Sequence, residues 1–221
     1  MAIEGRMPWS SNATLLVTVT CGDDAMRAIY KPESGERPLW DYPNGLWRRE
    51  VATYAVSEAL GWNLVPETIT RVDAPMGIGS LQRFVEDADF EQHYFTLVEE
   101  EIHHDRLRKM CVFDLVVNNA DRKGGHCLLT SDGEIFGIDH GLTFQPSPRL
   151  RTVIWEFGGQ PIPQVWRDDL RRVAEAPLAE LDELLDPDDI EAFRRRANAV
   201  ADLPKIPTVS EDYRHYPWPY V

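Results

Sequence analysis

Two aspartates and a histidine lie close together near the middle of the chain. Asp121 and His126 fall within the segment Asn118–His126, and Asp139 follows in the segment Ile138–Gly141. An aspartate can orient an attacking hydroxyl or accept its proton, while further ligands hold the metal ion that bridges the phosphates of a nucleotide. The spacing therefore indicates phosphoryl transfer, with Asp121 as the catalytic group and His126 and Asp139 as metal ligands. The alternative for Asp121 is an Asx turn that stabilises its own loop.

The residue types at the metal site leave the metal open. Magnesium prefers oxygen ligands, whereas an imidazole nitrogen favours manganese or another transition ion. We therefore expect Mg²⁺ or Mn²⁺ at His126 and Asp139. A hydrogen-bonding role is the alternative for His126.

Two cations follow Asp121 directly. Arg122 and Lys123 could stabilise the transferred phosphate, or each could pair with an acidic neighbour. The alternative is that both are exposed loop charges. We treat both as candidate catalytic groups.

Further candidates lie near the amino terminus. Lys31 ends a predicted strand and Glu50 lies in the helix that follows, which is the order in which a lysine pairs with a helix carboxylate and contacts the phosphates of ATP. The alternative is two solvated surface charges. Ser10, Ser11 and Asn12 form a short polar turn that could offer hydroxyls and N–H groups to phosphates.

The elements that must position Lys31 and Glu50 occupy the first part of the chain. Alternation of apolar and polar residues predicts a hairpin of strands 12–20 and 27–31. Four-residue spacing of apolar side chains predicts a helix over 47–60. Two apolar stretches, 64–72 and 79–85, indicate further strands.

The second part of the chain positions Asp121 and Asp139. An apolar periodicity over 107–116 predicts a helix that leads into the Asp121 segment. Strands 127–129 and 134–138 flank an Asp-Gly turn, so the hairpin should bring His126 and Asp139 to one end.

The last part of the chain is predicted to be helical. Asp186 and Pro187 suit the N-cap and first turn of a helix over 188–201. The aromatic stretch after Pro204 is expected to be irregular.

The order of elements predicts an α+β fold with two lobes. Residues 1–86 would form a small, β-rich N-terminal lobe that binds ATP, and residues 87–221 a mainly helical C-terminal lobe with the catalytic groups. A cleft between the lobes would hold the ligand.

Composition limits the function. The 221 residues carry a formal net charge of −14, which argues against a nucleic-acid partner. The sequence contains no apolar run of the ~18–20 residues that a membrane span needs, so we expect a cytoplasmic protein. Three cysteines without metal-ligand spacing disfavour a disulfide framework or a zinc site.

On these residues the chain resembles the atypical kinase superfamily that includes the phosphatidylinositol 3- and 4-kinases and the HipA-type bacterial kinases. It is most similar to small actinobacterial proteins described as phosphatidylinositol 3-/4-kinase-like. The resemblance runs from about Met7 to about Pro163 and rests on five segments in the same order, namely Pro8–Asn12, Ile29–Pro32, Arg48–Glu50, Asn119–Arg122 and Ile138–Gly141. It implies a bilobal, atypical protein-kinase-like fold with ATP between the lobes, Lys31 on phosphates, Asp121 as catalytic Asp and Asp139 on metal.

The chain departs from the lipid kinases at two places. Those kinases have Asp-Arg-His followed by a metal-binding Asn, where this chain has Asp121-Arg122-Lys123 and then His126. The segment after Asp139 also lacks a basic stretch that could grip an inositol phosphate, since residues 144–151 contain only two cations.

The expected function is an ATP- and metal-dependent phosphotransferase that acts on a protein Ser/Thr or on itself, and the acceptor could also be a small molecule. The alternatives are a nucleotide-binding pseudokinase, transfer of AMP, and a lipid (phosphatidylinositol) kinase. A non-enzymatic adaptor that binds partners through Tyr213–Trp218 is a further alternative.

Overall fold

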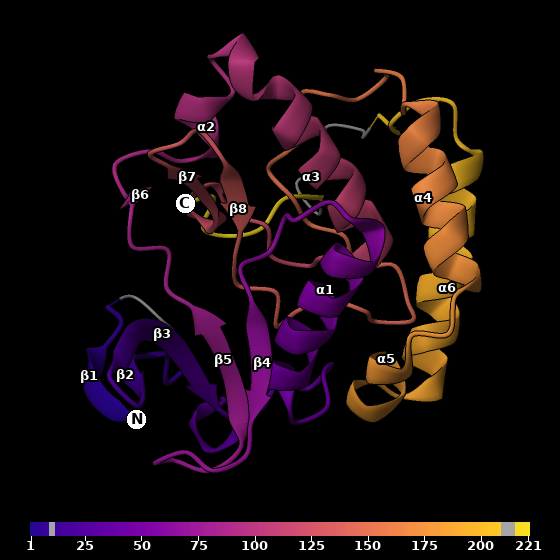
Figure 1. The fold of residues 1–221 in the computed structure, drawn as a ribbon. Coiled ribbons are helices and arrows are strands. Elements are labelled where there is room, and N and C mark those ends of the chain that lie inside the picture. The colour runs from indigo at the N-terminus through magenta and orange to yellow at the C-terminus, as the bar shows by residue number, and fades with distance from the viewer. Residues whose placement is uncertain (9–11, 209–214) are drawn as a thin grey trace.

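The computed structural model describes residues 1–8, 12–208 and 215–221 (Figure 1). An antiparallel sheet lies on one side and the long helices lie on the other. The sheet has five strands in the order β1-β2-β3-β5-β4, with bounds β1 (Ala2–Arg6), β2 (Leu15–Cys21), β3 (Asp24–Pro32), β4 (Thr68–Arg71) and β5 (Gly79–Arg83).

Alternating burial explains the central strands of the sheet. Leu15, Val17, Ala28 and Tyr30 point to one face and form a small core with Leu81 of β5. The predicted hairpin of β2 and β3 is therefore confirmed. Its turn contains Gly22 at φ +62°, a conformation that glycine adopts without strain.

The sheet differs from the prediction at two places. Strand β1 was not predicted, because all five of its residues are exposed and it shows no hydrophobic alternation. The strand predicted for 64–72 is shorter, since Leu64 and Val65 are buried in the main core rather than paired in the sheet.

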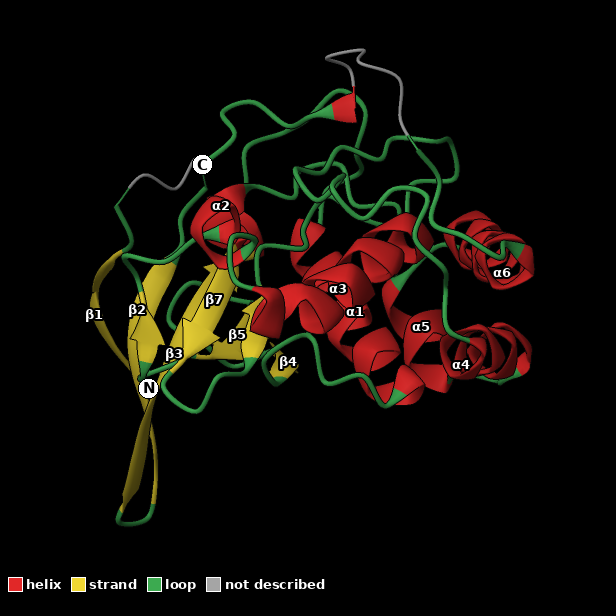
Figure 2. Ribbon diagram, turned by 90° about the horizontal axis from the view of Figure 1, so that it is seen from above, coloured by secondary structure: helices red, strands yellow, loops and turns green. Residues whose placement is uncertain are grey.

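The helix α1 (Leu46–Leu60) lies between the five-stranded sheet and the helices α4 (Gln164–Glu175), α5 (Ala179–Leu184) and α6 (Pro187–Asp202), as both views show (Figures 1 and 2). It contacts β4 and β5 on one side and α4 and α5 on the other. The helix ends at Gly61 in a left-handed conformation (φ +70°), which glycine tolerates best. The predicted helix over 47–60 is confirmed.

The rest of the chain is mainly helical with one small sheet. Its strands β6, β7 and β8 pair in that order. The elements are β6 (Ala88–Asp89), α2 (Tyr94–Leu97), α3 (His104–Val117), β7 (Cys127–Thr130), β8 (Ile135–Gly137), α4 (Gln164–Glu175), α5 (Ala179–Leu184) and α6 (Pro187–Asp202), with short 3₁₀ turns at Glu33–Gly35, Glu101–His103 and Gly124–His126. The predicted hairpin of β7 and β8 is confirmed.

Helix α6 confirms the last predicted helix and the positions of Asp186 and Pro187 at its start. Asp186 occupies the N-cap position and Pro187 the first turn, yet the Asp186 side chain makes no capping hydrogen bond. The fixed φ of Pro187 suits the first helical position without that bond.

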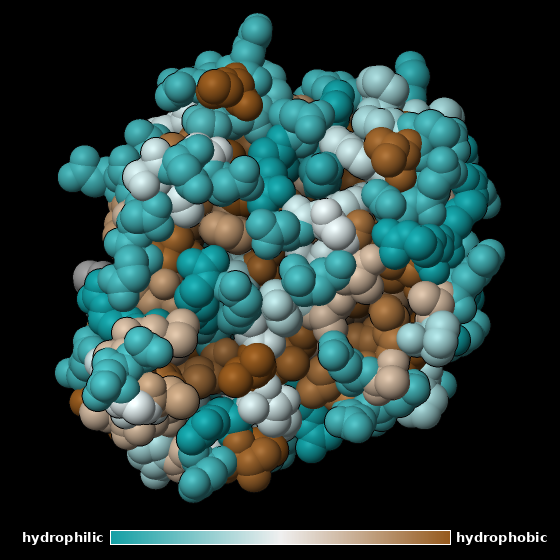
Figure 3. All heavy atoms as spheres, viewed as in Figure 1, coloured by the Kyte–Doolittle hydropathy of each residue, from teal (hydrophilic) through white to brown (hydrophobic). Residues whose placement is uncertain are grey.

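A single large apolar cluster runs from Trp47 in α1 to Ile206 and joins α1 to the later helices. The predicted α+β class, with a β-rich first part and helices after it, is confirmed. On the face drawn in Figure 3, hydrophilic side chains cover most of the surface and apolar patches remain between them. Within the described residues, none of the helices combines the length and the apolar character that crossing a bilayer requires.

Candidate active site

A cavity of about 1250 Å³ opens beside β3, α1 and the loop after α3. It is lined by Lys31, Glu50, Asp121, His126 and Asp139. Asn12 and Lys123 line it as well, so the structure brings together seven of the predicted site residues, which are spread over more than a hundred positions of the sequence.

Lys31 is the centre of the charged network. It lies opposite Ser80 in the β3–β5 pair, and its ammonium group donates to Glu50 and to Oδ1 of Asp139, the latter at 2.8 Å. Burial alone would lower the pKa of Lys31, but Asp139 and Glu50 outweigh it and raise the pKa. Lys31 therefore stays charged at every physiological pH.

Glu50 is fixed by α1 and by a backbone donor. Its side chain is buried, and Oε2 accepts the N–H of His140 at 2.9 Å. The helix that carries it is capped by Glu36, whose carboxylate accepts the N–H groups of Gly45, Leu46 and Trp47 at 2.9, 2.9 and 2.8 Å. Sequence analysis missed this cap, because Glu36 precedes the helix by ten residues instead of one.

The loop that carries Asp121, here called the Asp121 loop (residues 118–126), is held by asparagines. Asn118 ends α3 in a left-handed conformation (φ +54°), and its amide group donates to Gln145 and Ser147 carbonyls at 2.8 Å each. Oδ1 of Asn119 accepts the Asp121 N–H at 3.0 Å. The Asx turn considered for Asp121 is thus made by Asn119, which leaves the Asp121 carboxylate for other partners.

Asp121 faces the cavity with its side chain a quarter exposed. Burial raises its pKa to about 6, and the ammonium of Lys123, 3.1 Å from Oδ2, opposes this rise. A carboxylate with such a pKa is deprotonated at pH 7 yet basic enough to take a proton. Lys123 pairs with its acidic neighbour, which was one of the two roles considered for it.

Arg122 is buried completely and does not reach the cavity. Its guanidinium lies 3.0 Å from Oδ1 of Asp114, donates to the carbonyls of His126 and Ile138 at 3.2 and 3.1 Å, and contacts Nε2 of His140 at 2.6 Å. The idea that Arg122 stabilises transferred phosphate is corrected, because every direction around its guanidinium is taken by protein. It ties the Asp121 loop to the segment that carries Asp139.

Sequence analysis also missed Asp114 and His140, the partners of Arg122. Asp114 was detectable in principle, since it interrupts the apolar stretch of α3 and a carboxylate at such a position is seldom buried unless paired. Burial lowers the pKa of His140 well below its usual value, and Arg122 adds to this effect. The neutral ring can then accept the hydrogen bond from Arg122.

His126 and Asp139 meet at the open end of the β7–β8 hairpin, as predicted from the turn. Nε2 of His126 lies 3.5 Å from Oδ2 of Asp139. Burial lowers the pKa of His126 to about 4, so the ring is neutral at pH 7. The ammonium of Lys31 has the largest effect on Asp139 and holds its pKa well below the usual range, and His126 adds a smaller effect in the same direction.

The donor set fits a divalent cation that accepts nitrogen. Asp139 is half exposed, ionised and adopts a left-handed backbone (φ +60°), a strained conformation that persists where the surroundings enforce it. His126 offers a neutral nitrogen beside it. In the described part of the chain, His, Cys, Asp and Glu side chains form no metal-binding group of three or more.

The polar turn is described only in part. Ser10 and Ser11 lie outside the described residues. Asn12 lines the cavity, but its Oδ1 accepts the N–H of Arg37 at 2.9 Å. Its side-chain oxygen therefore supports the neighbouring loop.

Residues near the carboxyl terminus also line the cavity, which sequence analysis did not foresee. They are Tyr216, Pro217, Trp218, Pro219 and Val221. No local pattern could have placed them there, because their contacts are with segments about a hundred residues earlier.

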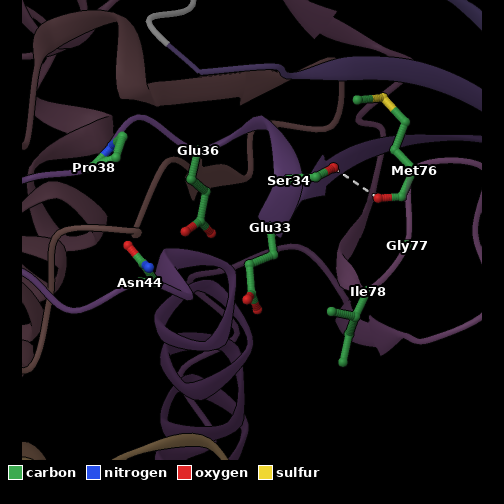
Figure 4. Close-up of a pocket in the computed structure, with 8 residues that line it drawn as sticks. All are labelled: Glu33, Ser34, Glu36, Pro38, Asn44, Met76, Gly77 and Ile78. Atoms are coloured by element: carbon green, nitrogen blue, oxygen red, sulfur yellow. Dashed lines mark hydrogen bonds between the residues drawn. The ribbon is translucent and has the colours of Figure 1, made fainter.

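A second pocket of about 400 Å³ lies at the start of α1 (Figure 4). Its polar groups already serve the fold. Glu33 accepts the indole N–H of Trp47 at 2.7 Å, and Ser34 donates to the carbonyl of Met76 at 2.9 Å. We assign no chemistry to it.

Comparison with known proteins agrees with this geometry. Residues 50–173 match the family described as phosphatidylinositol 3- and 4-kinase. The chain is 41% identical over 256 residues to Protein Rv2133c of Mycobacterium tuberculosis, covering 99% of this chain and 91% of that protein.

Two solved structures share the fold. One is hydra Fam20 with sugar, at a TM-score of 0.54 and 14% identity, covering 91% of this chain and 84% of that one. The other is the Helicobacter pylori proinflammatory kinase CtkA, at a TM-score of 0.53 and 15% identity, covering 97% and 94%. Identities this low speak for the fold alone.

Proposed function

Because the chain belongs to the phosphatidylinositol 3- and 4-kinase family, we propose that it is an ATP- and metal-dependent phosphotransferase that phosphorylates a protein Ser/Thr or itself. The observation that carries the proposal is one contact network. Lys31 bridges Glu50 and Asp139 in a cavity that Asp121 also lines. A fixed cation, an ionised carboxylate and a basic carboxylate in one cavity are the groups that phosphoryl transfer requires.

The cavity offers apolar and charged groups that suit different parts of ATP. Its lining includes Phe84, Val85, Phe90, Leu128 and Ile138, which would offer an apolar surface to the base. The ammonium of Lys31 would contact the phosphates, and Glu50 would orient it. The two proposed lobes, 1–86 and 87–221, meet at these apolar residues. The proposed location of the protein is the cytoplasm, where ATP is abundant.

Asp121 is the proposed catalytic group of the transfer. The acceptor hydroxyl would donate its proton to the Asp121 carboxylate while its oxygen bonds to the γ-phosphorus. The bond from that phosphorus to the β–γ bridging oxygen breaks, and ADP leaves. Lys123 would hold the carboxylate in place through the contact of 3.1 Å.

His126 and Asp139 would hold the divalent metal. When bound, that ion supplies positive charge to the phosphates as charge develops on them. The neutral imidazole of His126 makes Mn²⁺ a better fit than Mg²⁺.

The lipid acceptor receives little support from the segment after Asp139. Of its two cations, Arg149 lies 3.3 Å from Asp41 and stacks over the ring of Trp40 at 5.6 Å. The second cation, Arg151, lines the cavity. The relation to HipA-type kinases stays a prediction.

The test is transfer of label from γ-labelled ATP to the purified chain, with Mg²⁺ and with Mn²⁺. Asp121→Ala and Asp139→Ala should abolish labelling while each variant keeps the wild-type melting temperature within a few degrees. Lys31→Ala should lose both labelling and the ATP-induced rise in melting temperature. Wild-type labelling in Asp121→Ala would refute the assignment of the catalytic group.

A pseudokinase is the second candidate, because His126 stands where the lipid kinases have a metal-binding Asn. In that case the substitution would have cost catalysis while the nucleotide still binds. That function predicts an ATP-induced rise in melting temperature without product. Label from α-labelled ATP would instead indicate transfer of AMP.

A further inference from the structure

The last residues of the chain lie against the Asp121 loop. The N–H of Gly124, three positions after Asp121, donates to the carbonyl of Tyr220 at 2.7 Å. The N–H of Thr152 and the indole N–H of Trp155 both donate to the carbonyl of His215, at 3.1 and 3.2 Å. Residues 215–221, here called the tail segment, are thus anchored at both ends on the C-terminal lobe.

The last four residues of the tail segment are exposed to solvent. Trp218 is 82% exposed, and Val221 is 61% exposed. The ring of Tyr220 contacts the rings of Tyr216 and Trp218 edge-on, with centroids 5.9 and 5.6 Å apart, so most of its aromatic contacts are internal. A segment with few buried contacts opens at low cost in free energy.

The cavity has room for a nucleotide beside the tail segment. Its volume of about 1250 Å³ exceeds the ~300–1000 Å³ of most small-molecule sites. The tail segment lines it together with Asp121 and Lys123, and Gly124 binds it directly. The tail segment therefore forms part of the cavity wall next to Asp121.

We infer that the tail segment is a gate on the acceptor side of the cleft. ATP binds with the gate closed, whereas a macromolecular acceptor reaches Asp121 only after residues 216–221 leave the Asp121 loop. This inference rests on the proposed function, because it presumes that ATP and an acceptor share the cavity.

A reversible lock tests the gate in the full-length chain. A Cβ atom on Gly125 would lie 3.9 Å from Cγ1 of Val221, and the backbone of Gly125 is not left-handed. Gly125→Cys combined with Val221→Cys can therefore form a disulfide with minor adjustment. Cys21→Ser removes the exposed native thiol, while Cys111 and Cys127 are buried.

The two probes are plain ATP and ATP that carries a fluorophore on its γ-phosphate, here called γ-fluorophore ATP. The fluorophore extends toward the side where the acceptor would bind. Reduction of the disulfide should raise the affinity for γ-fluorophore ATP at least tenfold and change the affinity for plain ATP less than twofold. The same protein serves as its own folding control, because its melting temperature is measured in both states. Gly125→Cys and Val221→Cys alone should show no dependence on the reductant.

Other results overturn the gate. Equal affinities for γ-fluorophore ATP in the disulfide-bonded and reduced states would show that the tail segment blocks no ligand. If the disulfide lowers the affinity for plain ATP as much as that for γ-fluorophore ATP, the tail segment covers the nucleotide site and not the acceptor site. If even the wild-type chain does not bind plain ATP, the proposed function fails, and the gate fails with it.

Discussion

At the scale of single residues, burial and charge act on Asp121 in opposite directions. Burial raises its pKa to about 6, while the neighbouring Lys123 lowers it. The carboxylate therefore titrates close to neutral pH. This balance gives the proposed catalytic group a measurable signature.

Transfer should depend on pH through Asp121. Because only the ionised carboxylate can accept a proton, kcat/KM should fall about tenfold per pH unit below pH ~6 and level off above pH ~7. Lys123→Met removes the ammonium that lowers the Asp121 pKa, so its midpoint should move to higher pH. Lys123→Arg keeps a cation and serves as the control. If the midpoint stays the same in Lys123→Met, a group other than Asp121 causes the pH dependence.

Arg122 is expected to matter for stability. Arg122→Met leaves the buried carboxylate of Asp114 without its cation, which costs about 3–5 kcal/mol of unfolding free energy. Arg195→Met removes an ion pair of similar type in which both side chains are largely exposed, and should cost less than about 1 kcal/mol. Urea unfolding measures both. Similar midpoints for the two variants would show that the Arg122 network contributes little.

At the scale of elements, β5 holds β3 and therefore Lys31. Gly79 lies opposite Pro32 in the strand pair, and a Cβ atom there would come within 2.3 Å of the Lys31 carbonyl oxygen and 2.8 Å of Cα of Pro32. Both contacts are with backbone, which cannot rotate away. The strand that carries Lys31 would have to shift.

Gly79→Ala should weaken both stability and ATP binding. Overpacking of this kind costs about 1–3 kcal/mol, and the shift of Lys31 should reduce the ATP-induced rise in melting temperature. Gly5→Ala is the matched control, since a Cβ atom on Gly5 meets nothing within 4 Å. An unchanged response to ATP in Gly79→Ala would mean that the position of Lys31 tolerates movement of β3.

The sequence predicted those elements whose side chains alternate between core and solvent. The β2–β3 hairpin and α6 show such a pattern, and both are present. Helix α1 and the β7–β8 hairpin are mostly buried, and they were predicted instead from four-residue apolar spacing and from the Asp-Gly turn. Strand β1 carries no pattern because it is exposed on both faces. Leu64 and Val65 look like the start of a strand because they are apolar, yet they lie in the main core.

The candidate site was predictable only where charged residues follow one another along the chain in the order typical of kinases. Lys31, Glu50, Asp121, His126 and Asp139 converge as expected. The role of Arg122 and the position of the tail segment depend on contacts between distant segments, which local spacing does not encode.

At the scale of the whole molecule, α1 joins the sheet to the helical part of the chain. Arg49 on α1 donates to Asp189 of α6 at 2.7 Å, and both side chains are buried. Trp62, just after α1, packs on Trp166 of α4 with ring centroids 6.0 Å apart. The proposed lobes therefore share a core through this helix.

The chain should unfold in one step. Since α1 contacts both the sheet and the later helices, tryptophan fluorescence and far-ultraviolet circular dichroism should give the same urea midpoint. Arg49→Met should lower both midpoints equally, by breaking a buried pair. Two separate transitions, or a shift in one probe only, would show that the sheet folds independently of the helices.

The position of Val221 bears on where a fusion partner can be attached. Val221 lies beside Gly125, so an affinity tag or a reporter protein fused after it would stand at the mouth of the cleft. Strand β1 at the other end is an exposed edge of the sheet, and the N and C labels stand apart in both views (Figures 1 and 2). Fusions are therefore better placed before Ala2 than after Val221.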